Sequence, residues 1–343
     1  MMEQKLSILV IGAGGIGGIT AARMINAGLN VEVVDNLPGL ADKIEKEGID
    51  LFGHTEPLKV KIPAYQSISE VPGKRDVILL ATKATALCSV AKEIQPLLKE
   101  ESAVVSLQNG ICEEYLIEKV GKEHLIGCVV GWGATVHEPG KLEKTSAGNF
   151  TIGTIDGGAP KHFESVVKML ETTAPVVVSE NILGCLYSKL IINSCITTLG
   201  AICGMTLGKM FAIKKIRRIF IGIIREAVAV GRAAEIKIEK YAGKLDFYNF
   251  ADESGLWAGF MKHLKIRVIG MKYRRLKSSS LQSLETGRKT EIDFLNGYIA
   301  QKGRERHVKT PLNDLLVKLV KEIEDGKRAI SYSNFELDLF NRY

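Results

Sequence analysis

Six consecutive residues near the start of the chain form a G-x-G-x-x-G pattern, Gly12-Ala13-Gly14-Gly15-Ile16-Gly17. The pattern follows an apolar run and opens a segment of helical character, which is the context that makes it informative. The first glycine permits a tight turn, the second lets backbone approach a pyrophosphate, and the third lets a helix pack on a strand. Phosphates would then face the amides of the helix N-terminus. The pattern predicts a dinucleotide-binding turn rather than a glycine-rich turn without function.

Asp35 ends a second apolar run and lies about 20 residues beyond the first glycine of the pattern. A carboxylate at this place accepts hydrogen bonds from the ribose hydroxyls of adenosine and repels a 2′-phosphate. No arginine directly follows it. Asp35 by itself therefore favours NADH over NADPH, and the alternative interpretation is an aspartate that only shapes the turn before Asn36.

Two more polar positions follow apolar runs. Lys83 comes after one run, and Asn109 lies in Gln108-Asn109-Gly110 after the next. In an open α/β sheet, ligands collect outside the carboxyl ends of the strands. Lys83 could reach an anionic cofactor, and Asn109 could hold a carboxamide, a ribose hydroxyl or a substrate. A surface lysine and an ordinary Asn-Gly turn are the alternatives.

The second half of the chain offers Lys189, Asn193 and Thr197, whose spacing of four residues puts them on one stripe of a helix. Their neighbours are apolar, so the helix is predicted to be largely buried. Buried lysine is rare unless it is paired or functional, and withdrawal from water makes it a better proton donor. The alternative is a lysine whose ammonium group reaches the surface.

Ser279 and Glu291 have ordinary local interpretations. The serines Ser278-Ser279-Ser280 could cap a helix, and Glu291 could sit on the first turn of another.

Strands that end at one edge of a sheet are needed to bring the N-terminal residues together. Short apolar runs occupy residues 6–11, 31–35, 76–81 and 103–107, and helical segments such as 15–27 and 85–98 separate them. This alternation predicts a Rossmann-type, doubly wound α/β domain with a mostly parallel sheet.

The character of the chain changes after the strand-like stretches at residues 149–153 and 175–178, because nearly everything from residue 181 onward looks helical. Thr310-Pro311 would supply the N-cap and first-turn pair of a helix over 312–324. We expect a dinucleotide-binding domain over residues 1–179 and an all-α substrate-binding and catalytic domain over residues 180–343.

Composition narrows the class of protein. Hydrophobic residues are 46% and charged residues 25% of the chain, which excludes a disordered, collagen-like or coiled-coil protein. The formal net charge of +7 is dispersed, with short basic clusters, so we expect small anions rather than nucleic acid as partners. Six irregularly spaced cysteines indicate reduced thiols in a cytoplasmic protein, and no zinc-ligand spacing occurs. No signal peptide is recognised, and the apolar stretch 182–203 contains Lys189 and Asn193, which indicates a buried helix rather than a membrane span.

Taken together, these segments resemble the ketopantoate reductase (2-dehydropantoate 2-reductase) family. The matching features occur in the family's order over residues 6–325, and the stretch around Glu291 is the most specific. They are the Gly12–Gly17 motif, Lys83, Gln108-Asn109-Gly110, Lys189-Leu190-x-x-Asn193, Ser279-x-Leu281-Gln282 and Thr290-Glu291-Ile292-Asp293-x-Leu295-Asn296-Gly297.

The resemblance implies a Rossmann domain followed by a helical domain, with the active site in the cleft between them. It also implies reduction of ketopantoate to pantoate, a step of pantothenate and coenzyme A biosynthesis, with a nicotinamide cofactor that is usually NADPH. By position, Lys189 would be the general acid, and Asn193 and Ser279 would bind substrate. Asn109 would lie near nicotinamide and substrate, and Lys83 and Glu291 would contact the cofactor.

The sequence departs from the family's pattern in three places, which involve four residues. Thr197-Thr198 replaces a second asparagine and a proline, and Leu207 stands where a further substrate asparagine is expected. Thr197 keeps a hydroxyl on the stripe, which would reach substrate directly or through a water. Asp35 is the third departure, since it opposes the usual NADPH preference.

The leading hypothesis is therefore a cytoplasmic, NAD(P)H-dependent reductase of ketopantoate. A reductase of another branched 2-oxo acid is the runner-up, and a dinucleotide-binding sensor without catalysis is third. The expected partner is a small 2-oxo acid, with no nucleic acid, membrane or metal. A homodimer is one option that the sequence leaves open.

Overall fold

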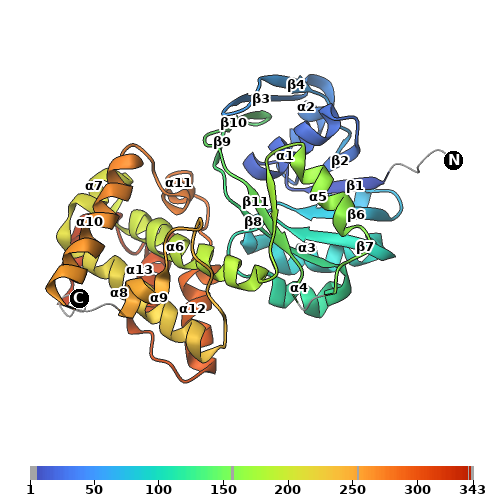
Figure 1. Cartoon of the computed structure of the whole chain (residues 1–343). Helices are drawn as coiled ribbons and strands as arrows, with labels where there is room; N and C mark the ends of the chain where they lie inside the picture. The colour runs from blue at the N-terminus through green and yellow to red at the C-terminus, as the bar shows by residue number, and fades with distance from the viewer. Residues whose placement is uncertain (1–5, 156–157, 253–254, 339, 341–343) are drawn as a thin grey trace. The chain divides into compact units, whose positions relative to one another are not determined.

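The structure is a computed structural model, and it describes residues 6–155, 158–252, 255–338 and 340. The chain divides into two compact units, Met1–Ile182 and Leu183–Tyr343 (Figure 1). The division falls three residues after the boundary expected from the sequence.

The first unit is built on an eight-stranded sheet. Its order across the sheet is β12 (Val176–Val178), β11 (Phe150–Gly153), β8 (Leu125–Val130), β7 (Leu98–Ser106), β6 (Arg75–Leu80), β1 (Ser7–Ile11), β2 (Asn30–Val34) and β5 (Ala64–Tyr65). All neighbouring strands are parallel except β8 and β11. The central strands β1 and β6 are buried on both faces, which explains why they read as continuous apolar runs.

Helices cover both faces of this sheet, as the doubly wound fold class requires (Figure 1). They are α1 (Gly15–Asn26), α2 (Leu40–Glu47), α3 (Leu87–Glu93), α4 (Glu113–Val120) and α5 (Phe163–Glu171), with 3₁₀ turns η1 (Ile68–Glu70), η2 (Ala84–Ala86), η3 (Gln95–Leu97) and η4 (Lys122–His124). On one face, Ile8 and Val10 of β1 form a common core with Ile19 of α1 and Leu170 of α5. The predicted α/β class of this half is confirmed.

The helix expected over residues 85–98 is wrong in its extent. The segment is broken into η2, the seven-residue α3 and η3, and the chain then enters β7 at Leu98. Pro96 lies in η3 and lacks the amide that a continuing α-helix would need, so the helix cannot extend to Leu98.

A second sheet of four strands was not expected from the sequence. Its order is β4 (Leu58–Val60), β3 (Ile49–Gly53), β10 (Lys141–Lys144) and β9 (Ala134–Glu138), and β3 and β10 run parallel although they are about 90 residues apart. Leu142 of β10 is fully buried and lies against Gly18 of α1. A Cβ on Gly18 would be only 2.6 Å from the Leu142 Cδ1. The small sheet therefore braces the helix that follows the glycine turn.

The second unit is all-α, as predicted. Among its described residues, the β pairing is limited to one isolated bridge between Tyr241 and Leu245. Its helices are α6 (Ile182–Cys203), α7 (Leu207–Ala212), α8 (Lys214–Ala233), α9 (Phe247–Asp252), α10 (Leu256–Lys272), α11 (Ser279–Glu285), α12 (Asn296–Glu305) and α13 (Pro311–Glu324), with 3₁₀ turns η5 (Ile292–Phe294) and η6 (Tyr332–Glu336). Within the described part of the chain, α6 alone is long and apolar enough to cross a membrane, and 72% of its most apolar stretch is buried inside the protein.

The N-terminus of α13 corrects one expectation. Pro311 is the first helical residue, but the Thr310 side chain does not cap the helix and instead bonds Asp314 Oδ2 at 3.1 Å. The cap comes from another helix, because the Glu226 carboxylate of α8 accepts hydrogen bonds from the amides of Leu312 and Asn313, each at 2.9 Å. A distant side chain thus does what local sequence suggested for Thr310.

Candidate functional site

The glycine turn joins β1 to α1 with a backbone that only glycine adopts easily. Gly12 has φ +99°, and its amide donates to the Val34 carbonyl of β2 at 2.7 Å. A Cβ on Gly12 would lie 2.8 Å from the Thr82 nitrogen and 2.9 Å from the Ala81 carbonyl, both beyond the end of β6. The turn is therefore held tightly against the ends of both neighbouring strands.

The other two glycines of the pattern meet different surroundings. A Cβ on Gly17 would lie 2.0 Å from the Gly12 carbonyl oxygen, so this glycine is required for α1 to approach β1. A Cβ on Gly14 would meet nothing within 4 Å, and Gly14 is the N-cap of α1 without a side-chain cap. Protein packing does not explain the missing side chain at Gly14, whereas close approach of a phosphate does.

Asp35 is tied to this turn. Its Oδ2 accepts the amide of Ala13 at 2.8 Å and its Oδ1 accepts the amide of Leu37 at 2.9 Å. The carboxylate is half-buried, and each of its oxygens has a second lone pair besides the one used in these bonds. Asp35 thus shapes the turn and also stands beside the glycine pattern, so the two interpretations of this residue are compatible.

Lys83 and Asn109 follow neighbouring strands, β6 and β7, and so lie at the same carboxyl edge as the glycine turn. Gln108 joins the two strand ends, since its Nε2 donates to the Thr82 carbonyl at 3.2 Å and to the Thr82 hydroxyl at 3.1 Å. Lys83 is exposed and Asn109 is half-buried. The fold therefore gathers the turn, Asp35, Lys83 and Asn109 at one edge of the sheet.

Sequence reasoning missed Glu113, the first residue of α4. Its side chain is fully buried, and burial raises the pKa of its carboxyl to about 7. Hydrogen bonding to the backbone at Glu113 and Cys112 and to the Ser106 side chain lowers the pKa of this carboxyl, but less than burial raises it. A glutamate in the first turn of a helix is common, so the sequence carried no signal that this one is buried.

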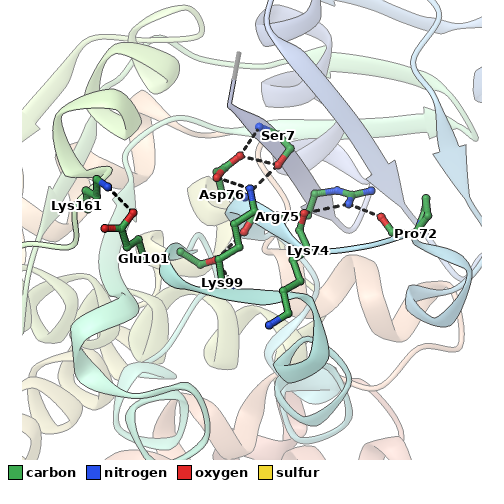
Figure 2. A network of polar contacts seen from close by, with 9 residues as sticks. Ser7, Pro72, Lys74, Arg75, Asp76, Lys99, Glu101 and Lys161 are labelled. Carbon is green, nitrogen blue, oxygen red and sulfur yellow. Dashed lines mark hydrogen bonds and ion pairs between the residues drawn. The ribbon is translucent and has the colours of Figure 1, made fainter. Parts of the chain in front are cut away.

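Figure 2 shows the opposite, amino edge of the same sheet, where polar side chains pair with one another. Asp76 accepts hydrogen bonds from Ser7 Oγ at 2.7 Å and from Lys99 Nζ at 2.6 Å. Burial would raise the pKa of Asp76, but the bonds from Lys99 and Ser7 lower it to about 2. Glu101 forms an ion pair with Lys161 nearby. These charges hold strands and loops together, and the candidate residues of the first unit lie at the other edge of the sheet.

Lys189 and Asn193 share the half-buried stripe of α6, while most of the helix around them is buried. Lys189 is therefore less buried than the apolar pattern suggested. Thr197, one turn beyond Asn193, is buried, and its hydroxyl donates to the Asn193 carbonyl at 2.7 Å. Its proton is thus used inside the helix, which leaves its oxygen lone pairs for any contact with a substrate.

A network of buried polar side chains forms hydrogen bonds with α6 at Ser194 and Thr198, next to the polar stripe. The Thr198 hydroxyl donates to Asn296 Oδ1, and Asn296 Nδ2 donates to the Ser194 carbonyl at 3.2 Å and to Asn313 Oδ1 at 2.9 Å. Asn313 Nδ2 donates to Glu226 at 2.7 Å. Four helices, α6, α8, α12 and α13, are joined by these side chains, and burial raises the pKa of Glu226.

The remaining predicted residues fall in the second unit as follows. Ser279 is exposed and begins α11, and Ser278 rather than Ser279 caps that helix by accepting the amide of Leu281 at 3.2 Å. Glu291 is half-buried and precedes η5. Leu207 begins α7 and is buried, so this position offers no polar group. In the described residues, no group of His, Cys, Asp and Glu is placed to hold a metal ion.

Comparison with known proteins decides the family. The model of the family "Ketopantoate reductase PanE/ApbA" matches residues 8–157, and that of "Ketopantoate reductase PanE/ApbA C terminal" matches residues 181–324. The chain belongs to the ketopantoate reductase family. The two matches together span the glycine turn and the Lys189 helix, as the resemblance in the sequence indicated.

Individual relatives agree with this assignment. The 2-dehydropantoate 2-reductase of Pyrococcus abyssi is 29% identical over 328 residues, covering 95% of this chain and 99% of the relative. The crystal structure of a PanE/ApbA family ketopantoate reductase from Ralstonia eutropha is 26% identical with a TM-score of 0.80, covering 94% of this chain and all of that one. A D-mandelate dehydrogenase structure with NADH and anilino(oxo)acetate has the same TM-score at 24% identity, covering 94% and 99%, and shares the fold.

Proposed function

We propose that this protein is an NAD(P)H-dependent 2-oxo acid reductase whose first candidate substrate is ketopantoate. The observation that carries the proposal is the polar stripe of α6, where Lys189 and Asn193 stand half-buried on a helix that is otherwise apolar and buried. Membership of the ketopantoate reductase family supports the same reaction class.

The residues at the carboxyl edge of the first unit fit a nicotinamide dinucleotide. Gly14 leaves open the space that a Cβ would fill, and α1 begins there without a side-chain cap. The turn from Gly12 to Gly17 would hold the pyrophosphate, Asp35 would accept from the adenosine ribose, and Lys83 would contact the cofactor. From the second unit, Glu291 would also contact the cofactor. When bound, the cofactor supplies the hydride that reduces the carbonyl carbon. Asn109 would orient nicotinamide and substrate.

Lys189 would act as the general acid. As the carbonyl carbon is reduced, its oxygen gains negative charge and takes a proton from Lys189 Nζ, so that an alcohol forms. Asn193 and Ser279 would bind the substrate by hydrogen bonds. Thr197 would contribute only as an acceptor, because its hydroxyl proton is donated to the Asn193 carbonyl.

The choice between NADH and NADPH depends on what lies beside the 2′ position of the adenosine ribose. Family membership favours NADPH, whereas the Asp35 carboxylate beside the glycine turn favours NADH. We expect activity with both cofactors.

A panel of 2-oxo acids, assayed with NADH and NADPH in parallel, tests the function. Ketopantoate should be reduced by the wild-type protein, and the Lys189→Met variant should lose the activity while binding the cofactor. A protein that binds the cofactor but reduces no 2-oxo acid would be a dinucleotide sensor instead.

A reductase of another branched 2-oxo acid is the second candidate. Buried Leu207 and the internally bonded Thr197 take away polar groups expected for a ketopantoate pocket. The D-mandelate dehydrogenase structure shows that this fold also accommodates an aryl-substituted oxo acid analogue. Higher kcat/KM for an apolar 2-oxo acid than for ketopantoate would favour this candidate.

The proposed partner is a small 2-oxo acid in the cytoplasm, with neither nucleic acid nor membrane involved. A homodimer is also proposed, in line with the dimeric ketopantoate reductase of Staphylococcus aureus, whose structure shares this fold.

A further inference from the structure

Glu291 lies at the end of an irregular segment that connects α11 to η5. Its side chain is half-buried, and its chain neighbours Thr290 and Ile292 are only 4% and 2% exposed. Buried polar groups need partners inside the protein, so the amide and the hydroxyl of Thr290 must be bonded there. Whatever holds Thr290 therefore also fixes the backbone from which the Glu291 side chain extends.

Glu324, the last residue of α13, is that partner. Its Oε1 accepts hydrogen bonds from the Thr290 amide and from the Thr290 hydroxyl, both at 2.6 Å. The same hydroxyl accepts the amide of Ile292 at 3.2 Å. Hydrogen bonds to a carboxylate are shorter and stronger than those between neutral groups. Glu324 thus holds the residue before Glu291 directly and the residue after it through Thr290.

A second contact from α13 is weaker. Lys321 lies one turn before Glu324 on the same side of the helix, and its Nζ lies 2.7 Å from Asp293 Oδ1. Both side chains of this pair are half exposed or more, and exposed ion pairs contribute little to stability. The two bonds to buried Thr290 should therefore fix the segment more strongly than the pair with Asp293.

We propose that Glu324 is a positioning residue for cofactor binding, because it holds Thr290 and thereby sets the place of Glu291. Without the Glu324 carboxylate, two buried donors of Thr290 would lose their acceptor, and the segment would shift toward water to satisfy them. Glu291 would move with the segment. The inference rests on the proposed function for the contact between Glu291 and the cofactor, and it does not depend on which 2-oxo acid is reduced.

Fluorescence titration of the whole protein with NADH and with NADPH tests the proposal without any turnover. Glu324→Ala should raise the dissociation constant of the cofactor by about 10-fold. Glu324→Gln keeps an acceptor oxygen for Thr290, so its dissociation constant should stay within about 3-fold of the wild-type value. Lys321→Met should also stay within about 3-fold, because its ion pair is exposed.

The matched control is Glu322→Ala in the same turn of α13. The Glu322 carboxylate accepts a hydrogen bond from Arg328 Nε at 2.6 Å and makes none with Thr290. This substitution should lower stability, as Glu324→Ala does, but it should leave the affinity for the cofactor unchanged. Urea denaturation measures the stability, and circular dichroism checks that each variant is folded.

A double-mutant cycle determines whether Glu324 acts through Glu291. Glu291→Gln should itself weaken cofactor binding. Adding Glu324→Ala to it should weaken binding by less than about 2-fold more, since the contact that Glu324 positions is already lost. A general effect of Glu324 on the fold would instead give the same loss with and without Glu291.

Three results would overturn the proposal: unchanged cofactor affinity in folded Glu324→Ala, equal losses in the two backgrounds, or wild-type affinity in Glu291→Gln. If the affinity follows Glu324 as expected but no 2-oxo acid is reduced, the inference stands and the reductase function is wrong. A wild-type protein that binds neither NADH nor NADPH would contradict both.

Discussion

The glycine turn and the α6 stripe position their residues by different means. In the turn, Gly12 and Gly17 fit against backbone and side-chain atoms of β1 and of the residues just after β6, so contacts between adjacent strands set the geometry. In α6, apolar neighbours surround the helix on most sides, and apolar packing by itself is non-directional. The rotation of α6 about its axis, and hence the direction of Lys189, requires something more specific.

The buried network around Asn296 supplies that specificity. It binds α6 at Ser194 and Thr198, each one residue beyond a member of the polar stripe. Single buried polar residues fix the register of helices elsewhere for the same reason, since any other rotation leaves them without partners. The comparison teaches that backbone contacts with adjacent strand ends specify the turn, whereas the stripe depends on side-chain hydrogen bonds from residues about 100 positions away.

The largest expected effect is that of Lys189→Met. If Lys189 donates the proton, kcat should fall by about 100- to 10,000-fold, while the dissociation constant of NAD(P)H stays nearly unchanged because the turn is intact. Stopped-flow turnover and fluorescence titration measure the two quantities. Lys302→Met, which removes a lysine paired with Glu305 on α12, is the control and should retain activity. Turnover of Lys189→Met within a few-fold of wild type would refute the general acid.

Substitutions of Gly17 and Gly14 should have different effects, the first on stability and the second on cofactor binding. Gly17→Ala forces a Cβ against the Gly12 carbonyl and should cost about 3 kcal/mol of unfolding free energy. Gly14→Ala meets no protein atom, so it should cost less than about 1 kcal/mol. It should nevertheless weaken cofactor binding by roughly 10-fold, or 1.4 kcal/mol, because the methyl group occupies the approach of the pyrophosphate. Urea denaturation and titration distinguish these effects, and equal cofactor affinity in Gly14→Ala would show that the phosphates bind elsewhere.

Thr198→Val should break the network without a change in side-chain shape. The Asn296 carbonyl would lose its donor, at a cost of about 1–3 kcal/mol in stability. If α6 then rotates, kcat of Thr198→Val should fall. Thr198→Ser keeps the hydroxyl and should retain the wild-type kcat. The matched control is Thr310→Val, which removes another buried hydroxyl of the same unit, bonded to Asp314, and should lower stability but not kcat.

The native thiols of α6 report the rotation without any assay of activity. Cys185 lies on the half-buried stripe, and Cys195 is fully buried. In Thr198→Val, the rate of Cys195 alkylation should rise relative to that of Cys185. An unchanged ratio together with reduced kcat would mean that the network does not set the orientation of α6.

Asp35→Asn should move the cofactor preference toward NADPH. The amide keeps the size of the side chain and one acceptor oxygen but removes the repulsion of the 2′-phosphate, worth roughly a 10-fold change in the ratio of kcat/KM values. Asp35→Ser also loses the bonds to the amides of Ala13 and Leu37, so it should be less stable by about 1.5–3 kcal/mol. An unchanged ratio in both variants would place the ribose away from Asp35.

The smallest expected change is that of Thr197→Asn. If ketopantoate is the substrate, an added amide on the stripe should lower KM by about 2- to 12-fold, the value of one hydrogen bond, with little effect on kcat. Loss of ketopantoate reduction in Thr197→Asn with retention in Thr197→Ser would indicate a pocket built around threonine and a different 2-oxo acid.

Much of the fold could be predicted because its signals are local. Buried parallel strands read as apolar runs, so β1, β2, β6 and β7 were recognised, and the helical second half followed from its composition and periodicity. The small sheet could not be predicted, because β3 and β10 are short, partly exposed and paired over about 90 residues. The cap of α13 by Glu226 was hidden for the same reason, since it joins residues far apart in the chain.

By itself, the sequence determined the glycine turn, the strand ends that carry Asp35, Lys83 and Asn109, and the stripe of Lys189 and Asn193, because each depends on the spacing of nearby residues. Only the tertiary structure decided that the Thr197 hydroxyl donates to the Asn193 carbonyl and that Asn296 forms hydrogen bonds with α6. It also decided that Glu113 is buried, which raises the pKa of its carboxyl to about 7. Burial and long-range hydrogen bonds depend on which elements pack together, and no local pattern of residue types records that.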